Sequence, residues 1–432
     1  MVGKAGLITV IGFSIILGYI SLNVARLAKN SIANMSSYAD ATLSHGLATT
    51  GANVGLARFY SDTTWFGDTT QTLTGPHFRG SFRIKVEDLG GNNVRLRSTS
   101  AYVSPSTPFA ETLRDTVEVF FNKNRQQTFS IFAWMTNNEN GVNWTTQDTV
   151  WGRVHSNSTL TVNGAPVFFE KVTTTKNFNK KPGTSPNNAI FKKGYETGVA
   201  SVDLPTSLTT LDTAAANHGK KYTDSIWVKL YPGTAADGDG KVAIRKWTAA
   251  GTLLDSIQLN SATFNGVIAS TKSIHVAKST LDGALSIVSL SQDVIIEDDV
   301  TYEMNPQTTT SNDLLGLIAG RNVMVKDNAA NNASCTIQGC VFSKDGSFWA
   351  EGYNRGPLFG TLNVLGSIVQ NTRGPVGTIS GSVLSTGFSK RYRYDNRLSD
   401  PSVRPPYFPG YFVKTYAITN WWESYRVPNI NQ

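Results

Sequence analysis

The sequence has only two cysteines, few charges, and no acidic residue before Asp40. Only 16% of its 432 residues are charged, whereas its 38 glycines and many serine, threonine and asparagine residues indicate a turn-rich chain. This composition is closer to a secreted, strand-rich protein than to a helical cytosolic enzyme. At roughly 150 residues per domain, the length allows two or three structural units. We therefore expect strands and turns to dominate after the first sixty residues.

The common catalytic motifs are missing, because no Gly-x-Ser-x-Gly, His-Glu-x-x-His or Walker sequence occurs. His155 and His218 lack a convincing Ser and Asp partner set, which favours structural roles for both. Asp237 and Asp239 resemble part of a calcium loop but lack its other ligands, so a tight turn is the better interpretation. We expect no enzyme activity, no cofactor and no metal site.

One acidic cluster can be compared with a glycosidase site, since a β-solenoid can carry two catalytic carboxylates at a defined separation. The cluster follows an apolar run and falls largely in a turn, where solvated acids are usual. We interpret it as solvated surface. Its members are Asp293, Glu297, Asp298 and Asp299.

The net charge of +8 raises the question of a polyanionic partner. Neither group of basic residues is a long block, and isolated basic side chains on a solvated surface explain both. We therefore expect no nucleic-acid partner. The two groups are Lys176, Lys180, Lys181, Lys192 and Lys193, and then Lys390, Arg391, Arg393 and Arg397.

The two cysteines, Cys335 and Cys340, are five positions apart. A zinc site is poorly supported, because neither a nearby histidine nor a second cysteine pair accompanies them. In an exported chain a local disulfide across a tight loop is predicted, with two unpaired buried thiols as the alternative.

The segment from Ala5 to Val24 contains twenty residues without a charge. At 1.5 Å per residue it spans about 30 Å, the thickness of the hydrocarbon core of a bilayer. Apolar residues then recur at three- and four-residue steps as far as Val54, with no proline before Pro76. One helix of about 55 residues is predicted, apolar all round at first and amphipathic later. Its second half is expected to pack against the chain's own globular part.

Small residues recur along this helix as far as Gly46, Gly51 and Gly55. Each interior glycine costs about 1 kcal/mol of helix propensity relative to alanine, and close helix–helix approach would offset that cost. An ordinary anchor with incidental glycines is the alternative. The predicted assembly surface comprises Leu7, Ile8, Val10, Ile11, Gly12, Phe13, Ile15, Ile16, Leu17, Gly18, Ile20, Leu22, Val24, Leu27, Ile32 and Met35.

This helix, ending in ATTGANVGLARFYSD, resembles the N-terminal helix of type IV pilin-like proteins, in particular the minor-pilin-like group. Residues 151–174 and 351–378, followed by STGFSKRYRYDNRL, resemble an uncharacterised family of large bacterial envelope proteins with a pilin-like start and a β-rich body. The resemblance implies export, membrane residence before assembly, and polymerisation into a filament with a helical core. Major pilins usually have a glutamate at the fifth mature position, where this sequence has Ala5.

The predicted fold class is α+β, mainly β, with the long pilin-like helix over residues 1–60. FRIKVEDLGGNNVRLRSTSAYV alternates on both sides of a Gly-Gly-Asn turn, which predicts a hairpin in an antiparallel β domain with a surface insertion over 61–220. Apolar runs recurring about every 20 to 30 residues over 221–380 favour a parallel β-solenoid over a meander. The aromatic, proline-rich tail over 381–432 is expected to wrap the body, the alternative being exposure for carbohydrate or partner contacts.

These patterns lead to the hypothesis of a structural subunit of an extracellular pilus-like filament. The expected partners are copies of the chain itself and the inner-membrane pilus-type assembly machinery, with surface glycans as a further candidate. The alternative is a membrane-anchored, carbohydrate-binding or carbohydrate-cleaving β-solenoid that acts as a monomer. A minor pilin that only primes or tips a filament is a third hypothesis.

Overall fold

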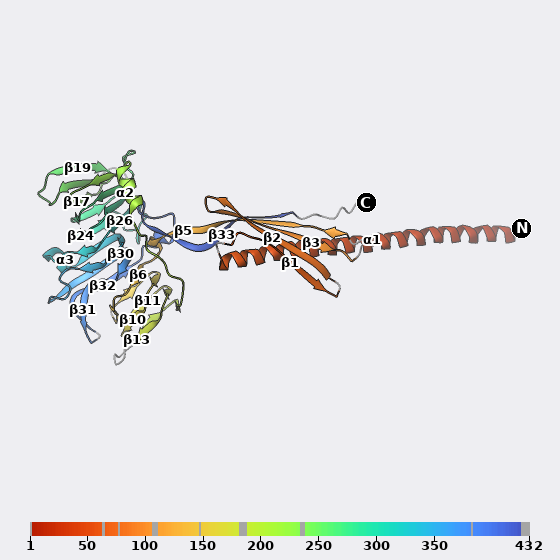
Figure 1. Cartoon of the computed structure of the whole chain (residues 1–432), viewed down its shortest axis with the longest axis horizontal. Coiled ribbons are helices and arrows are strands. Elements are labelled where there is room, and N and C mark those ends of the chain that lie inside the picture. The colour runs from red at the N-terminus through yellow and green to blue at the C-terminus, as the bar shows by residue number, and fades with distance from the viewer. Residues whose placement is uncertain are drawn as a thin grey trace. The chain divides into compact units, whose positions relative to one another are not determined.

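A computed structural model describes residues 2–62, 65–76, 78–105, 111–146, 148–180, 188–233, 238–381 and 383–424. A long N-terminal helix precedes a mainly β body that contains both parallel and antiparallel sheets, which confirms the predicted fold class (Figure 1). The chain divides into two compact units. We call residues 1–125 with 412–432 the helix–sheet unit, and residues 126–411 the coil unit.

The helix–sheet unit consists of one helix and a sheet in the order β1-β2-β3-β5-β33, with β4 paired to β3. Strands β1, β2, β3 and β5 are antiparallel, and β2 and β3 form the predicted hairpin. Its turn needs positive φ angles, which Gly90, Gly91 and Asn92 adopt at 79°, 56° and 69°. The elements are α1 (Val2–Ser61), β1 (Asp68–Gly75), β2 (Phe78–Gly90), β3 (Asn93–Val103), β4 (Thr112–Leu113), β5 (Thr116–Thr128) and β33 (Gly410–Ser424).

The later part of the coil unit contains a run of successive β-strand turns, here called coils, which follows the short helix α2 (Thr209–Ala216). An antiparallel excursion, β17 to β19, extends the first coil. The strands are β16 (Lys220–Tyr222), β17 (Ile226–Tyr231), β18 (Lys241–Lys246), β19 (Leu253–Gln258), β20 (Val267–Ser270), β21 (Ile274–Val276), β22 (Ser279–Leu281), β23 (Ala284–Ser289), β24 (Val294–Ile296), β25 (Val300–Tyr302), β26 (Leu314–Ala319), β27 (Val323–Val325), β28 (Cys335–Ser343), β29 (Phe348–Ala350) and β30 (Leu358–Thr372), with α3 (Ala329–Ala333) before β28.

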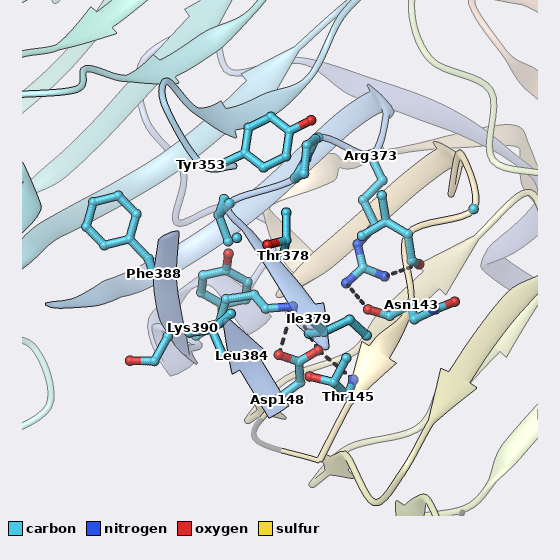
Figure 2. A pocket seen from close by; sticks show the side chains of 18 of the residues that line it. Asn143, Thr145, Asp148, Tyr353, Arg373, Thr378, Ile379, Leu384, Phe388 and Lys390 are labelled. Carbon is cyan, nitrogen blue, oxygen red and sulfur yellow. Dashed lines mark hydrogen bonds and ion pairs between the residues drawn. The ribbon is translucent and has the colours of Figure 1, made fainter. Parts of the chain in front are cut away.

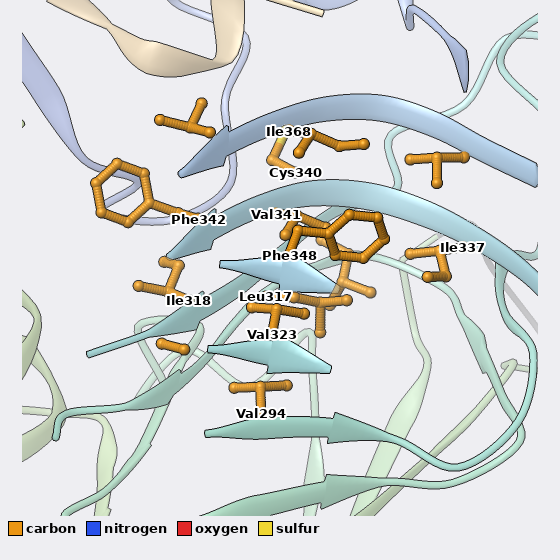
Figure 3. Close-up of a cluster of buried hydrophobic side chains, with 14 of the residues drawn as sticks. Val294, Leu317, Ile318, Val323, Ile337, Cys340, Val341, Phe342, Phe348 and Ile368 are labelled. Atoms are coloured by element: carbon orange, nitrogen blue, oxygen red, sulfur yellow. The ribbon is translucent and has the colours of Figure 1, made fainter. Parts of the chain in front are cut away.

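Equivalent strands of these coils pair in parallel, so apolar side chains at equivalent positions stack inside. Val294, Val323 and Phe348 are in register on one face, and all three are fully buried. Leu317, Val341 and neighbouring side chains fill the interior from another face (Figure 3). In this arrangement each coil buries its apolar side chains against the next, as is expected for a parallel β-solenoid.

A second run of coils precedes the first in sequence and differs from the antiparallel domain predicted over 61–220. Its strands pair in parallel in sets of three, in which β10 lies between β7 and β13, β11 between β8 and β14, and β12 between β9 and β15. The strands are β6 (Trp134–Asn138), β7 (Trp144–Thr145), β8 (Thr149–Val150), β9 (Val154–Ser156), β10 (Leu160–Asn163), β11 (Val167–Phe168), β12 (Val172–Thr174), β13 (Phe178–Lys180), β14 (Ile190–Phe191) and β15 (Tyr195–Thr197), with the 3₁₀ turn η1 (Phe129–Ile131) before β6.

The two runs form one continuous ladder, because β6 pairs in parallel with β30 and places Trp134 opposite Ile368. The order along this ladder is β16, β20, β23, β26, β28, β30, β6, β9, β12 and β15. A boundary at residue 220 therefore does not separate two structural units. Stacking of coils across that boundary is what joins them.

The tail has three parts and not one wrapping segment. Strand β31 (Gly377–Ser380), just before the predicted tail, and strand β32 (Val383–Arg393) belong to the coil unit, where β32 pairs in parallel with β30. The next segment, with the 3₁₀ turn η2 (Asn396–Ser399), lies along the coils, since Ser286 Oγ donates to the carbonyl of Pro406 at 2.6 Å. Strand β33 then enters the sheet of the helix–sheet unit, where Trp421 packs on the core and Trp422 remains 61% exposed.

The predicted disulfide is wrong, because Cys335 and Cys340 are both free and buried. Both are in β28, where Cys335 is in register with Leu362 and Cys340 with Ser367. Strands rise about 3.3 Å per residue, so five residues of β28 separate the Cα atoms beyond the roughly 4.4–6.8 Å of a disulfide. The alternative of two buried thiols is the one that the structure shows.

Candidate assembly surface

Helix α1 changes environment near Asp40, which is 6% exposed and is its first acidic residue. N-terminal to this position its described side chains are almost all exposed, and C-terminal to it one face is buried against the sheet. Figure 1 shows α1 extending past the strands of its own unit. The helix thus has a free part, residues 3–38, and a packed part, residues 40–61.

The packed part begins with polar contacts. Ser104 Oγ donates to Asp40 at 2.5 Å, and Ser44 and Ser100 share a hydrogen bond of 2.9 Å. His45 Nδ1 lies 2.7 Å from an Asp115 oxygen, and its Nε2 lies 3.3 Å from Glu423. These contacts fix the helix to strands β3 and β33 and to the start of β5.

Burial and the nearby Asp40 carboxyl affect a neighbouring tyrosine of β3. Tyr102 is 1% exposed, and burial is the main cause of its raised pKa, with the charge of Asp40 adding to it. The phenol therefore stays protonated beside the carboxyl group.

Apolar packing continues below the polar contacts, where Gly51 and Gly55 let the helix approach the sheet. A Cβ atom on Gly51 would lie 2.2 Å from Ser98 Oγ and 2.9 Å from the ring of Phe82. A Cβ atom on Gly55 would lie 2.6 Å from Leu96 Cδ1. These two glycines, expected to serve helix–helix contacts, instead permit close packing against the chain's own sheet.

The predicted apolar assembly residues all lie in the free part of α1 and are between 50% and 76% exposed. Tyr19 and Tyr38 are exposed there too, at 68% and 60%, although the predicted assembly surface does not include them. The exposed predicted residues are Leu7, Ile8, Val10, Ile11, Phe13, Ile15, Ile16, Leu17, Ile20, Leu22, Val24, Leu27, Ile32 and Met35.

The free part is longer than a membrane span. Within the described residues, one helix is long and apolar enough to cross a bilayer, with a mean hydropathy of 2.1 in its most apolar window. Residues 3–38 extend for about 54 Å at 1.5 Å per residue, against about 30 Å of hydrocarbon. A bilayer that covers residues 5–24 would leave Leu27, Ile32 and Met35 outside the hydrocarbon.

The glycines of the free part are distributed around the helix. Gly6, Gly12 and Gly18 are six positions apart, and at about 100° per residue this spacing places them on three faces roughly 120° apart. Among the described residues, no atom outside the local helix lies within 4 Å of a Cβ built at any of the three. Such a distribution suits a helix with neighbours on several sides better than a two-helix contact.

The two histidines considered for catalysis have structural surroundings. His155 is buried in β9, with Nδ1 2.9 Å from Thr173 Oγ1 and Nε2 2.9 Å from Asn157 Oδ1. Burial is the main cause of its lowered pKa. His218 follows α2 with a φ of 65°, and its carbonyl accepts from the amide of Asn265.

The acidic cluster is engaged by neighbouring coils. Asp293 is paired with Arg321, Glu297 lies 2.6 Å from His275 and 2.9 Å from Lys326, and Asp299 accepts from the amide of Thr336 at 2.7 Å. Asp298 lies 3.9 Å from Lys278. Each carboxylate thus has a partner. Of the considered calcium loop, Asp237 lies outside the described residues.

The basic residues are not uniformly solvated. Lys390 is only 14% exposed and forms a 2.8 Å ion pair with Asp148, and Arg397 pairs with Asp395 at 2.7 Å. The solvated interpretation is wrong for these two residues, because buried carboxylates pair with them. Lys176, Lys192, Lys193 and Arg391 are exposed.

No protein-family model matches the chain, and no curated protein matches it. Among solved structures, the chain is similar to the competence-associated pilin ComZ from Thermus thermophilus. That likeness covers 89% of this chain and 98% of the pilin, with 11% sequence identity and a TM-score of 0.36. It is too weak to support an inference about function, which must come from the geometry of α1.

Proposed function

We propose that this protein is a structural subunit that polymerises with copies of itself into a pilus-like filament. The free part of α1 forms the contacts with neighbouring subunits, and the β-rich body is displayed outside the helical core. The role is structural and not catalytic. Before assembly, residues 5–24 reside in the inner membrane, from which pilus-type machinery transfers the subunit to an extracellular filament.

One observation carries the proposal, namely the length of exposed apolar helix compared with a bilayer. A lone anchor would leave Leu27, Ile32 and Met35 in water, where they are 69%, 70% and 76% exposed. Burying such a side chain contributes about 1.5–3 kcal/mol, so a partner for this part of the helix is strongly favoured. A second copy offers an apolar surface of matching length, because its own helix has the same unpaired extent.

The mechanism is burial and close packing. In the bilayer, lipid tails already cover residues 5–24, so burial alone does not favour transfer of this segment into the filament. Transfer requires helix–helix contacts that are closer than the contacts with lipid. Gly6, Gly12 and Gly18 permit close approach on three faces of α1. The segment after Val24 adds the hydrophobic contribution, because it moves from water into the filament core.

A matched pair of charge substitutions tests the proposal. Leu27→Glu places a carboxylate outside the membrane-spanning segment but inside the expected filament core, where an unpaired charge costs several kcal/mol. Leu89→Glu makes the same change at the β2–β3 turn, where the side chain is 50% exposed. We expect Leu27→Glu to abolish filaments in negative-stain images of sheared cell-surface material, and Leu89→Glu to leave them unchanged.

Both variants should accumulate to wild-type levels in the membrane fraction, which separates failed assembly from failed folding. Filaments of normal length and abundance from Leu27→Glu would contradict the proposal. Wild-type protein that remains as dispersed particles on expressing cells would favour a monomeric, membrane-anchored role instead.

A further inference from the structure

The coil unit contains a cavity of about 230 Å³ where its two runs of coils meet. Its lining comes from the loop before β7, from residues 373–376, and from β31 and β32. Figure 2 shows Arg373 beside Asn143, and Lys390 reaching Asp148. The cavity belongs to one unit and lies among described residues.

Two ion pairs lie at its wall, and three of their four side chains, those of Arg373, Lys390 and Asp148, line the cavity. Arg373 Nη1 donates to Glu139 at 2.8 Å, with these side chains 1% and 3% exposed. The Arg373 guanidinium lies 4.0 Å from the ring centroid of Trp144 and 5.1 Å from that of Trp134. Lys390 Nζ donates to Asp148 at 2.8 Å, and burial is the main cause of the lowered pKa of Lys390.

These pairs contrast with the rest of the coil interior. That interior is mainly valine, isoleucine, leucine and phenylalanine, with a few other buried polar residues such as Asp282 and Asp313. A buried ion pair contributes little stability compared with apolar side chains of similar volume, because removing charges from water is costly. Charged groups that are gathered around a cavity are therefore better explained by ligand binding than by stability alone.

Two polar atoms of the lining residues have no hydrogen-bond partner among the described residues. They are the hydroxyl of Tyr392 and Nε1 of Trp134, and the two side chains are 3% and 2% exposed. A buried polar group without a partner costs about 1–3 kcal/mol. Lys390 Nζ lies 2.8 Å from both oxygens of Asp148, and because an ammonium has three N–H groups, it retains a donor for a ligand.

We propose that this cavity binds one ring of a neutral sugar. The two cations are balanced by two carboxylates, so an anionic ligand has no excess positive charge to attract it. Donors at Trp134 and Lys390, together with the Tyr392 hydroxyl, which can donate or accept, suit the hydroxyl groups of a sugar. Phe388 and Tyr353 supply aromatic wall against which the C–H face of the ring can pack.

The size agrees with one ring. A cavity of about 150 Å³ lined by apolar side chains holds benzene. At about 230 Å³, this cavity has room for a six-membered ring with its hydroxyl substituents. Sugar binding at this place does not depend on filament formation, because every group involved belongs to the coil unit.

The test uses the full-length chain in a zwitterionic detergent that contains no sugar. Saturation-transfer NMR and calorimetric titration are performed with the methyl glycosides of glucose, galactose, mannose and N-acetylglucosamine, and with glucuronate and inorganic phosphate as anionic comparators. We expect at least one neutral glycoside to bind more tightly than either anion. An oligosaccharide that ends in the same sugar distinguishes a free monosaccharide from a chain end as the source of the ring.

Tyr392→Phe removes only the unpaired hydroxyl and should weaken sugar binding about five- to tenfold. Tyr195→Phe is the matched control, because Tyr195 is 56% exposed in the same unit and is not part of the lining. Trp134→Phe removes the indole donor as a second variant, with thermal unfolding measured to verify its fold. Absence of glycoside binding, tighter binding of either anion, or unchanged affinity in Tyr392→Phe would overturn the proposal.

Discussion

The close approach of α1 to its sheet predicts opposite effects for the same substitution at two glycines of one helix. Gly51→Ala places a methyl group 2.2 Å from Ser98 Oγ and 2.9 Å from the Phe82 ring, and both neighbours are buried. Gly46→Ala places it in open space on an exposed turn. Only the first substitution must therefore displace part of the core.

The magnitudes can be worked out from these contacts. Alanine improves the helix propensity of either position by about 1 kcal/mol relative to glycine. Overpacking a core typically costs about 1–3 kcal/mol, and contacts this short place Gly51→Ala near the upper end. We expect a net loss of about 2 kcal/mol for Gly51→Ala and a gain of up to about 1 kcal/mol for Gly46→Ala.

Urea unfolding followed by the far-ultraviolet helix signal measures this difference, because α1 has 60 residues whereas α2 and α3 have 8 and 5. The full-length chain is kept monomeric in detergent, and each variant's free energy of unfolding is obtained by linear extrapolation. If Gly51→Ala is as stable as Gly46→Ala, the tight fit of the helix against β2 and β3 is incorrect.

Two further predictions concern the coil unit. Burial, with nearby acids, raises the pKa of Cys335 to about 12, and both Cys335 and Cys340 are buried free thiols, so both should resist thiol reagents in the native protein. In urea without reductant, the same reagents should detect two thiols per chain. Detection of no thiol in urea would contradict the free thiols. Burial opposes ionisation of Glu297, but hydrogen bonds from His275 and Lys326 outweigh it and lower its pKa. The ionised Glu297 should therefore stabilise the fold above about pH 4.5, and this stabilisation should decline as the pH falls through its lower folded-state pKa. Urea titrations from pH 6 to 3 measure the free energy of unfolding, which should decline less steeply with falling pH in Lys326→Met.

Local patterns were sufficient where structure depends on neighbouring residues. The apolar steps from Ala5 to Val54 predict a helix that the structure extends from Val2 to Ser61. The Gly90-Gly91-Asn92 turn predicts the β2–β3 hairpin, because few other residues adopt its positive φ angles easily. The exposed apolar residues of α1 could likewise be identified from sequence alone.

Long-range pairing could not be predicted in the same way. Strands such as β8 and β11 have two residues each, which is too short for a period of alternation to be recognised. Trp134 pairs opposite Ile368, and no local pattern relates positions so far apart in sequence. The region over 126–220 therefore looks like ordinary strands until its neighbours in the ladder are known.

The cavity shows the same limitation at the level of side chains. Lys390 stands in a basic stretch typical of solvated surface, and Arg373 follows a polar Gln-Asn-Thr sequence. Their carboxylate partners, Asp148 and Glu139, come from the other run of coils. These four residues form a buried, charge-balanced cluster only because the two runs of coils pack against each other.

The coil unit occupies the stretch of chain between β5 and β33, which are neighbours in one sheet. If a short hairpin turn connected β5 directly to β33, the sheet would keep both strands, and α1 would keep the residues against which it packs. The chain is thus organised as a helix and sheet with a second unit inserted between two adjacent strands. Exchange of this inserted unit for another domain would leave the contacts between α1 and its sheet intact.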